Sequence, residues 1–415
     1  MTVFSQKTAK RFCIALLFLL SALTAQASIA QPPGKTDEPE RIVLNLTRHP
    51  STSQAVTWRT MAEVSHPQAQ IAPAIAPVTF SDSCLTENAS TETVKLDYEN
   101  TVYYHSVVFK SLKPKTMYAY RVGDGKQWSE WNQFKTAADG PAPFEFVYFG
   151  DVQNNVLSLG ARIFRTAYRK APDARFWLFV GDLVNDGDRD AEWSELFSAF
   201  GWIPRVTPII LLPGNHEYPD RRFVDEQDLK IDRLWRPQFT LPENGPAGLE
   251  ESAYSIDYQG VRIVMLNGNE KLDEQARWLR SVLSENPQPW TIVAIHQPLY
   301  SGARNRDNFR SQKLFCPIFD QYSVDLVLQG HDHIYSRTCK LRNGRRAADD
   351  EKGTVYVVSV SGSKAYGIDN RYGKLMVKAE TGRQLFQVIR VDEHRLRYES
   401  FNALGESYDS FELKK

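Results

Sequence analysis

Five short polar motifs constrain the fold of this chain more than any other feature, because each directly follows an apolar run of strand length. Four of the five open with glycine, the residue that best tolerates the positive φ of a tight turn after a strand. The carboxyl edge of a sheet is where α/β folds place their ligands, so we expect all five motifs to project from that edge of one sheet. The motifs are Gly150-Asp151-Val152-Gln153-Asn154, Gly181-Asp182-Leu183-Val184-Asn185-Asp186, Gly214-Asn215-His216-Glu217, His296-Gln297-Pro298 and Gly330-His331-Asp332-His333.

The residue types in these motifs are those that bind divalent metal ions. Carboxylates and imidazoles supply charge and affinity, an amide oxygen adds a neutral ligand, and one carboxylate can bridge two ions. Two ions about 3.5–4 Å apart would clamp a phosphate group and acidify a water between them. A single Gly-Asp after a strand is more often a turn, and His296 alone would be an ordinary core histidine. Together and in this order, the motifs predict a dinuclear metal site.

The part of the chain that carries the motifs, residues 143–415, alternates between strand and helix patterns. Such alternation predicts an α/β domain, in which layered β-sheets are flanked by helices. The expected strands are 144–149, 176–180, 207–212, 261–266, 290–295, 325–329 and 354–360. Helices are expected near 157–171, around a face formed by Trp193, Leu196, Phe197 and Phe200, and at 272–283.

Residues 41–137 have a different sequence pattern, which predicts an all-β sandwich. Short runs with period-2 alternation are separated by turn residues about every ten residues, with no helical stretch between them. Trp58 is the kind of large apolar residue that fills such a core, and residues 112–123 are typical of fibronectin-III-like modules. Residues 137–143 read as a linker. The expected strands are 41–47, 54–60, 93–98, 105–112, 117–123 and 133–136.

The first 30 residues have the layout of a secretory signal peptide. Lys7, Lys10 and Arg11 precede an apolar run, and small residues then allow cleavage after Ala27 or after Ala30. The alternative is an uncleaved membrane anchor, but the run is short for a span of about 20 residues. We therefore expect a secreted or periplasmic protein without a membrane anchor after cleavage.

Cysteine content limits the disulfides that can form, and net charge bears on nucleic-acid binding. Past the leader the chain keeps Cys84, Cys316 and Cys339, so at most one intrachain disulfide can form. Cys316 and Cys339 are the favoured pair. Buried free thiols are the alternative, because a chain of this size does not need disulfides for stability. Lys plus Arg and Asp plus Glu number 50 each, so no bulk charge points to nucleic acid, and we expect no nucleic-acid partner.

The five motifs, in this order, resemble those of the calcineurin-like metallophosphoesterases. The preceding β-sandwich resembles the N-terminal module of the purple acid phosphatases, so the resemblance covers nearly all of the chain from residue 41 onward. It implies hydrolysis of phosphomonoesters by attack of a metal-activated hydroxide on phosphorus, with two metal ions as cofactors. A phosphodiesterase with the same centre is the alternative.

The resemblance also implies a role for each motif residue. Asp151 and His333 would bind the first metal, and Asp182 would bridge both metals. His216 would contact the phosphate and help protonate the leaving oxygen instead of binding metal. The second metal would be completed by Asn215, His296 and His331.

Two positions depart from the family pattern at the first metal. Purple acid phosphatases have a tyrosine in the second motif, where this chain has Asn185, and many relatives have a histidine where this chain has Gln153. Gln153 or Asn185 could supply an amide oxygen, or water could take the place. The missing tyrosinate puts the purple colour in doubt and favours two divalent ions, from among Fe, Mn and Zn.

Residues that contact the rest of the substrate are less marked in the sequence. Arg304 and Arg306 follow the fourth motif, and guanidinium groups suit phosphate, although the two could equally be solvated loop charges. The segment 218–250 is expected to form one wall of the cleft.

The rival from another functional class is a non-catalytic module that binds sugars or proteins through the β-sandwich. That class predicts broken ligands throughout the motifs, whereas only the first site is altered.

Overall fold

The computed structural model describes residues 37–96, 100–218, 229–306, 308–348 and 350–415. Within these ranges, no helix is long and apolar enough to cross a membrane. The predicted leader lies outside the described residues. The helices are α1 (Ala161–Lys170), α2 (Asp190–Phe200), α3 (Trp235–Gln238), α4 (Leu272–Ser284) and α5 (Phe309–Tyr322).

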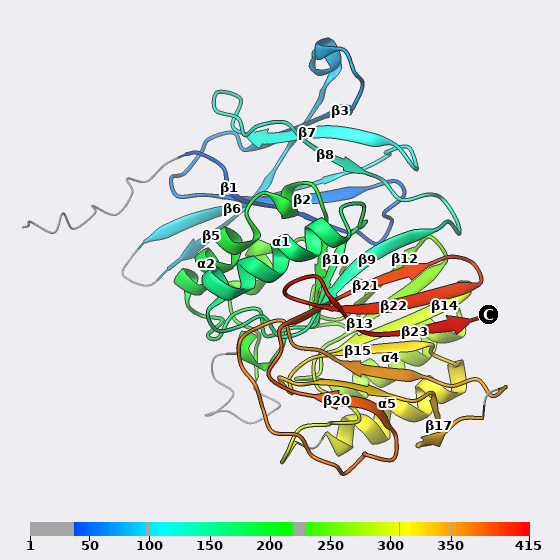
Figure 1. Ribbon diagram of the computed structural model, residues 1–415. Coiled ribbons are helices and arrows are strands. Elements are labelled where there is room, and N and C mark those ends of the chain that lie inside the picture. Colours follow the sequence, from blue (N-terminus) through cyan, green and yellow to red (C-terminus); the bar gives the residue numbers. More distant parts are fainter. Residues whose placement is uncertain (1–36, 97–99, 219–228, 307, 349) are drawn as a thin grey trace, which may run out of the picture. The chain divides into compact units, whose positions relative to one another are not determined.

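The N-terminal part is the predicted all-β sandwich (Figure 1). Its core joins Ile42, Val56 and Trp58 from one sheet to Ile71 and Tyr120 from the other. One face has the order β1 (Glu40–Asn45), β2 (Gln54–Thr60), β6 (Thr101–Phe109) and β5 (Ser90–Lys95). The opposite face has the order β4 (Leu85–Asn88), β3 (Gln68–Pro73), β7 (Met117–Gly123) and β8 (Asn132–Lys135).

The second part is built on two mixed sheets that pack face to face. One half of this sandwich has the order β23 (Ser407–Lys414), β22 (Arg395–Asn402), β21 (Leu385–Val391), β9 (Phe144–Phe149), β10 (Trp177–Phe179) and β11 (Ile209–Leu211). The other has the order β12 (Tyr254–Tyr258), β13 (Val261–Leu266), β14 (Trp290–Ile295), β15 (Leu326–Gln329), β19 (Val355–Val358), β16 (Tyr335–Thr338) and β20 (Met376–Glu380). A small hairpin joins β17 (Leu341–Arg342) to β18 (Arg345–Arg346).

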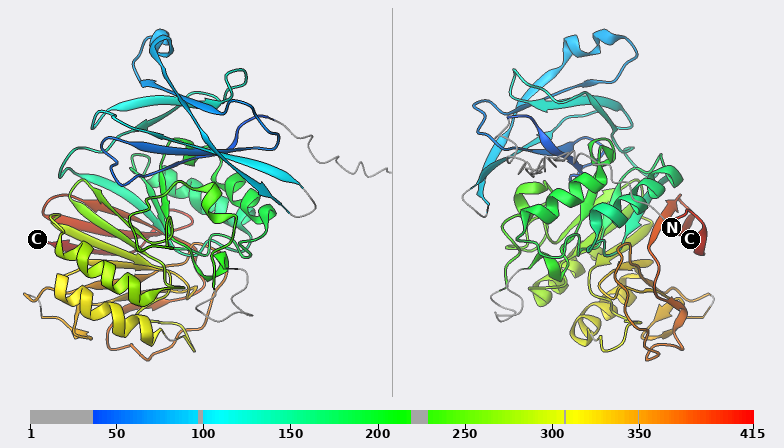
Figure 2. Two further views of the ribbon diagram at one scale, coloured as in Figure 1. Left: turned by 180° about the vertical axis from the view of Figure 1, so that it is seen from behind. Right: turned by 60° about the vertical axis from the view of Figure 1, so that its left-hand side comes forward.

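Helices cover the outer faces of both sheets. Along β13, Ile263 and Met265 point into the core between the sheets, whereas Val264 and Leu266 pack with residues of α4 and α5. Figure 2 shows these two helices along the outer side of the sheet. Successive side chains of a strand point to opposite faces, so a strand covered on both sides is apolar throughout. The predicted fold class, an all-β sandwich followed by a layered β-sandwich flanked by helices, is confirmed.

The two parts share one sheet, which the sequence did not predict. β1 pairs in parallel with β11, so the ten-stranded sheet runs from the second part into the N-terminal sandwich. The Asn45 side chain reinforces this seam, since its Nδ2 donates to Ile209 O at 3.0 Å and its Oδ1 accepts from Thr240 N at 3.1 Å.

Three further expectations need correction. The helix expected at 157–171 is a π-helical turn, Val156–Gly160, followed by the shorter α1. The motifs do not follow strands of one sheet: β9, β10 and β11 belong to one sheet, and β14 and β15 belong to the other. The three cysteines past the leader are free thiols, so the favoured Cys316–Cys339 disulfide is not formed.

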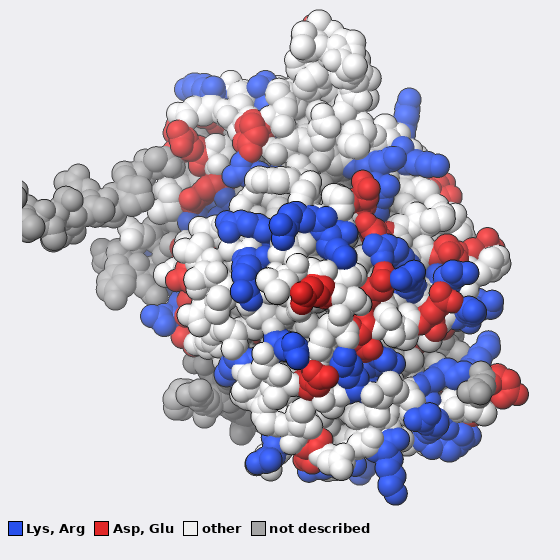
Figure 3. All heavy atoms as spheres, viewed as in Figure 1, with Lys and Arg blue, Asp and Glu red and all other residues white. Residues whose placement is uncertain are grey.

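Acidic and basic side chains are interspersed on the face shown in Figure 3, in keeping with the equal totals of 50 each.

Candidate metal centre

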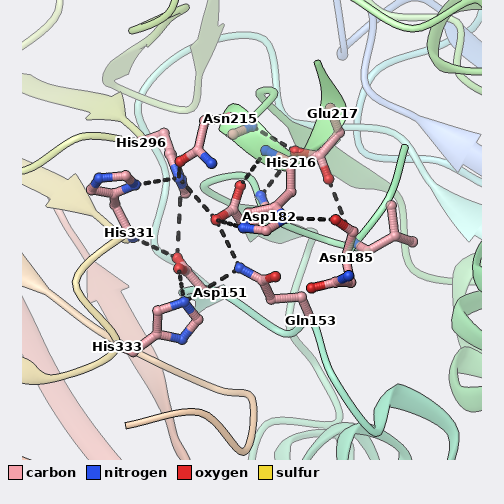
Figure 4. A network of polar contacts seen from close by, with 12 residues as sticks. Asp151, Gln153, Asp182, Asn185, Asn215, His216, Glu217, His296, His331 and His333 are labelled. Atoms are coloured by element: carbon pink, nitrogen blue, oxygen red, sulfur yellow. Dashed lines mark hydrogen bonds and ion pairs between the residues drawn. The ribbon is translucent and has the colours of Figure 1, made fainter. Parts of the chain in front are cut away.

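Polar side chains from the five motifs converge where the two sheets of the second part end together (Figure 4). β9, β10 and β11 run parallel to one another, as do β14 and β15. The carboxyl ends of each parallel set therefore lie at one edge. Because the sheets face each other, the loops that follow these strands meet across the end of the sandwich.

Glycines allow this close approach of loops. Gly181 has a φ of 90°, and a Cβ there would lie 2.3 Å from the backbone nitrogen of Gly214. A Cβ on Gly330 would lie 2.2 Å from Asp151 Oδ1. Contacts this short exclude any side chain at either position, so these glycines are required for the motif loops to touch.

Asp182 is common to two groups of metal-binding side chains. The groups are Asp182, His296 and His331, and Asp151, Asp182 and His333, and within each the ligand atoms lie within 4.8 Å of one another. The carboxylate of Asp182 is buried at the end of β10. One buried carboxylate is therefore shared by both groups of potential metal ligands.

The first of these groups also contains Asn215. His296 donates from Nδ1 to Val180 O at 2.7 Å, which directs its Nε2 toward Asp182 Oδ2 at 3.3 Å. Asn215 Oδ1 lies 3.3 Å from the same Nε2, and His331 Nδ1 lies 3.2 Å from it. A backbone hydrogen bond of this kind fixes the tautomer of a ligating histidine.

The second group is deeply buried and contains polar atoms without partners. His333 Nε2 lies 3.3 Å from Asp151 Oδ2, and Gln153 Nε2 donates to Asp182 Oδ2 at 2.8 Å. Within the described part of the chain, no hydrogen-bond partner was found for Asp151 Oδ2, Gln153 Oε1 or His333 Nδ1. Buried polar atoms are costly when unpaired, and a bound cation would provide the missing partner for Asp151 Oδ2.

The protonation states at the centre also fit metal binding. Burial and the charge of Asp182 raise the pKa of Asp151 to about 8, although His296 acts in the opposite direction. Burial acts to lower the pKa of His296, but Asp182 and Asp151 outweigh it and raise the pKa to about 9. Without metal, a proton on His296 thus compensates the buried carboxylates. A divalent ion would supply more positive charge at the same place.

The other two imidazoles are held neutral, which is the form that binds metal. Burial, His296 and Arg306 hold the pKa of His331 well below its usual range. Burial and Lys364 lower the pKa of His333 to about 3.

His216 lies beside the two groups without belonging to either. Its backbone N–H donates to Asp182 Oδ1 at 2.9 Å, and its Nδ1 lies 2.5 Å from Asn185 O. A carbonyl oxygen only accepts, so Nδ1 carries the proton in this contact. Nε2 then lies 3.9 Å from Asp182 Oδ2, in a half-buried side chain that lines the cleft.

Glu217 is a residue whose role the sequence analysis missed, although its motif was identified. Its buried carboxylate accepts hydrogen bonds from the backbone nitrogens of Asp182 at 2.9 Å, Leu183 at 2.8 Å and Gly214 at 2.7 Å. Burial and the Asp182 charge raise the pKa of Glu217 to about 7, and these donors oppose that shift. Through these hydrogen bonds, Glu217 links the loop of the second motif to the loop of the third.

The two amide side chains at the altered positions differ in where they point. Gln153 reaches the group that contains Asp151 and His333. The Asn185 Oδ1 instead accepts from Asn154 Nδ2 at 3.1 Å. Figure 4 shows Gln153 directed at Asp182 and Asp151, with Asn185 on the other side of Asp182 from His331.

A cleft of about 740 Å³ opens over the centre. Arg306 lines it, whereas the Arg304 side chain is exposed and is not among its lining residues. Lys364 and Tyr366, which the sequence analysis did not single out, also line it. Of the expected wall 218–250, Leu229 borders the cleft, and residues 219–228 lie outside the described ranges.

Family models match both parts of the chain. The model described as "Calcineurin-like phosphoesterase" matches residues 144–335, and the one described as "Purple acid Phosphatase, N-terminal domain" matches residues 39–136. Every motif residue discussed above falls within the first of these ranges.

Relatives and solved structures agree with these matches. An uncharacterized protein of Mycobacterium tuberculosis is 27% identical over 72% of this chain and 62% of its own length. A phosphoenolpyruvate phosphatase of Allium cepa is 24% identical over 82% of this chain and 73% of its own length. The structure of a purple acid phosphatase from yellow lupin superposes with a TM-score of 0.78 at 19% identity, covering 92% of this chain and 75% of that one. This chain thus spans less than two thirds of the mycobacterial relative.

Proposed function

This chain carries a calcineurin-like phosphoesterase domain and the N-terminal domain of the purple acid phosphatases, and we propose that it is a dinuclear-metal enzyme that hydrolyses phosphomonoesters. The resemblance predicted from the motifs is confirmed by both family matches. The observation that carries the proposal is the position of Asp182, whose carboxylate is shared by two separate groups of metal-binding side chains.

The grouping of the side chains supports one set of ligands for each proposed ion. Asp151 and His333 would hold the first ion, with Asp182 as the bridge. The second would be held by Asn215, His296 and His331. When bound, a pair of divalent ions supplies Lewis-acid stabilisation of phosphate charge and a nucleophile derived from water.

His216 is the proposed general acid. With Nδ1 fixed by the Asn185 carbonyl, Nε2 is the atom that takes up and releases a proton at the cleft. A substrate ester oxygen placed there would receive that proton as its bond to phosphorus breaks.

Gln153 is the proposed additional ligand of the first ion, in place of the family's tyrosine or histidine. Rotating its carboxamide by half a turn would bring Oε1 to the position of Nε2, 2.8 Å from Asp182 Oδ2. Asn185 is not in this position, because its amide oxygen is bonded to Asn154. A site with neutral Gln153 and no phenolate favours a divalent ion over a trivalent one.

Gln153→Ala is expected to lower the metal content from about two ions to about one ion per chain, because the first ion loses a ligand while the second keeps its own. Asn185→Ala is the matched control and is expected to retain both ions. Metal analysis of each purified variant after dialysis at limiting metal measures this difference. Loss of an ion from Asn185→Ala with full retention by Gln153→Ala would reverse the assignment.

The proposed activity is tested with a panel of phosphomonoesters and phosphodiesters, assayed with and without a chelator. We expect monoesters to be turned over faster than diesters, and chelation to remove both activities. Faster turnover of diesters would favour the phosphodiesterase alternative. No metal-dependent hydrolysis of either class would refute the proposed function.

Export to the periplasm or the medium, which rests on residues 1–30 outside the described ranges, stays a prediction.

A further inference from the structure

Two cations and a tyrosine form a cluster at one end of the cleft, which we call the cation–aromatic cluster. Its members are Arg306, Lys364 and Tyr366, and all three line the cleft. The Arg306 guanidinium lies 4.9 Å from the centroid of the Tyr366 ring, and the Lys364 ammonium lies 5.5 Å from it. Both cations thus lie against one aromatic ring, whose face attracts positive charge.

The cluster adjoins the proposed metal centre. The Tyr366 ring packs edge-on against His333 with 4.7 Å between ring centroids, and Arg306 Nη1 contacts His331 Nε2. Lys364 contributes to the low pKa of His333, and Arg306 to that of His331. The cluster therefore lies beside the metal-binding histidines and is not a remote surface feature.

Two loops distant in sequence are tied together to build the cluster. Ala303 and Ile368 form an antiparallel bridge, Arg304 N donates to Gly367 O at 2.9 Å, and Asp369 N donates to Gly302 O at 2.8 Å. Tyr366 N also donates to His333 O at 3.3 Å. These backbone contacts hold the cluster in place over the fifth motif.

Among the residues that the structure describes, no carboxylate lies within salt-bridge distance of Arg306 or Lys364. Of the described residues that line the cleft, only Asp182 is acidic, and its charge would be used by the metal ions. The buried Asp332 is close enough for Arg306 to lower its pKa, but its Oδ2 is bonded to Ser301.

We propose that the cation–aromatic cluster binds a second phosphate group of the substrate, so that the preferred substrates are bisphosphorylated compounds. This inference rests on the proposed function, because it places the scissile phosphate at the metal centre and the second phosphate at Arg306 and Lys364. Paired cations with several N–H donors suit a dianionic phosphate. Binding energy from such a non-reacting group can be used to accelerate the reaction.

The substrates for the test are fructose 1,6-bisphosphate and fructose 6-phosphate, which share the sugar and differ by one phosphate. The measured quantity is the ratio of kcat/KM for the bisphosphate to kcat/KM for the monophosphate. For the metal-loaded wild type we expect a ratio of about 10 or more, the effect of one charge-assisted hydrogen bond. Arg306→Met and Lys364→Met are each expected to lower this ratio by about tenfold.

Arg304→Met is the matched control, because it removes the same charge two residues from Arg306 but from a side chain outside the cleft. It is expected to keep the wild-type ratio. Tyr366→Phe should also keep the ratio, since the ring remains, whereas Tyr366→Leu should lower it. A ratio that is unchanged in both Arg306→Met and Lys364→Met would overturn the proposal. An equal fall in Arg304→Met would overturn it too, since general attraction by loop charges would then explain the preference.

Failure of the proposed function is distinguishable from failure of this inference. If the metal-loaded protein hydrolyses neither sugar phosphate, the dissociation constants of the two compounds can be measured by calorimetry with the same variants. Tighter binding of the bisphosphate that is lost in Arg306→Met and Lys364→Met would support the cluster's role. Equal binding of both compounds would refute it.

Discussion

Replacing Asp182 by Ala is expected to abolish phosphoester hydrolysis, with kcat lower by on the order of 10⁴-fold or more. The carboxylate belongs to both groups of metal-binding side chains, so its loss weakens both proposed ion sites at once. Nucleophile generation and stabilisation of phosphate charge would then fail together. The measurement is kcat on a phosphomonoester, with the metal content of the same preparation.

Two controls separate this loss from misfolding. Asp188→Ala removes an exposed carboxylate from the same loop and should retain metal and activity. Thermal unfolding of Asp182→Ala should remain cooperative, because the substitution also removes charge repulsion from the buried Glu217 and Asp151. His331→Ala, which alters only one group, should also be inactive. If either Asp182→Ala or His331→Ala kept near wild-type activity and a full metal complement, the site assignment would be disproved.

Replacing His216 by Ala should lower kcat by about 10²–10⁴-fold while leaving the metal content intact. The side chain lies outside both ligand groups, and its Nε2 faces the cleft region near Asp182. A general acid matters most when the leaving alkoxide is basic. The loss should therefore be large for alkyl phosphates and small for p-nitrophenyl phosphate, whose leaving group needs no proton.

The control for this variant is His394→Ala, which removes an exposed histidine and should leave both substrates unaffected. Equal losses for the alkyl and p-nitrophenyl esters would show that His216 is not the proton donor. A fall in metal content would instead assign it a role as a ligand.

The sequence predicted strands best where one pattern was uninterrupted. The observed bounds of β2, β7, β9, β13 and β14 match the expected ranges, because apolar or alternating residues are bounded there by clear turn residues. β3 and β4 were missed, since Gln68–Pro73 contains proline and glutamine and Leu85–Asn88 is exposed along its whole length. The alternation on which the prediction depended is absent from β4 and covers only Gln68–Ile71 in β3.

The motif residues could be predicted, but not the sheets that bring them together. A strand followed by a polar turn can be recognised locally, whereas strand pairing depends on distant segments. β9, for example, pairs with β21, which lies after all five motifs. For the same reason the division of the motifs between two sheets could not be foreseen.

Lys364 and Tyr366 could not be found from the sequence for a similar reason. They lie in an irregular segment, which the Ala303–Ile368 bridge and nearby backbone hydrogen bonds bring to the cleft. Glu217, by contrast, stood within a recognised motif. A buried acidic residue directly after two motif positions could have been assigned as an acceptor for loop N–H groups.

The number of metal ions needed for activity tests the dinuclear centre most directly. Metal-free protein should be titrated with Mn²⁺ or Zn²⁺ while hydrolysis of a phosphomonoester and bound metal are both followed. We expect no activity without metal and a plateau at about two ions per chain, as a bridging Asp182 requires. Full activity in metal-free protein, or a plateau at one ion per chain, would contradict the two-metal account.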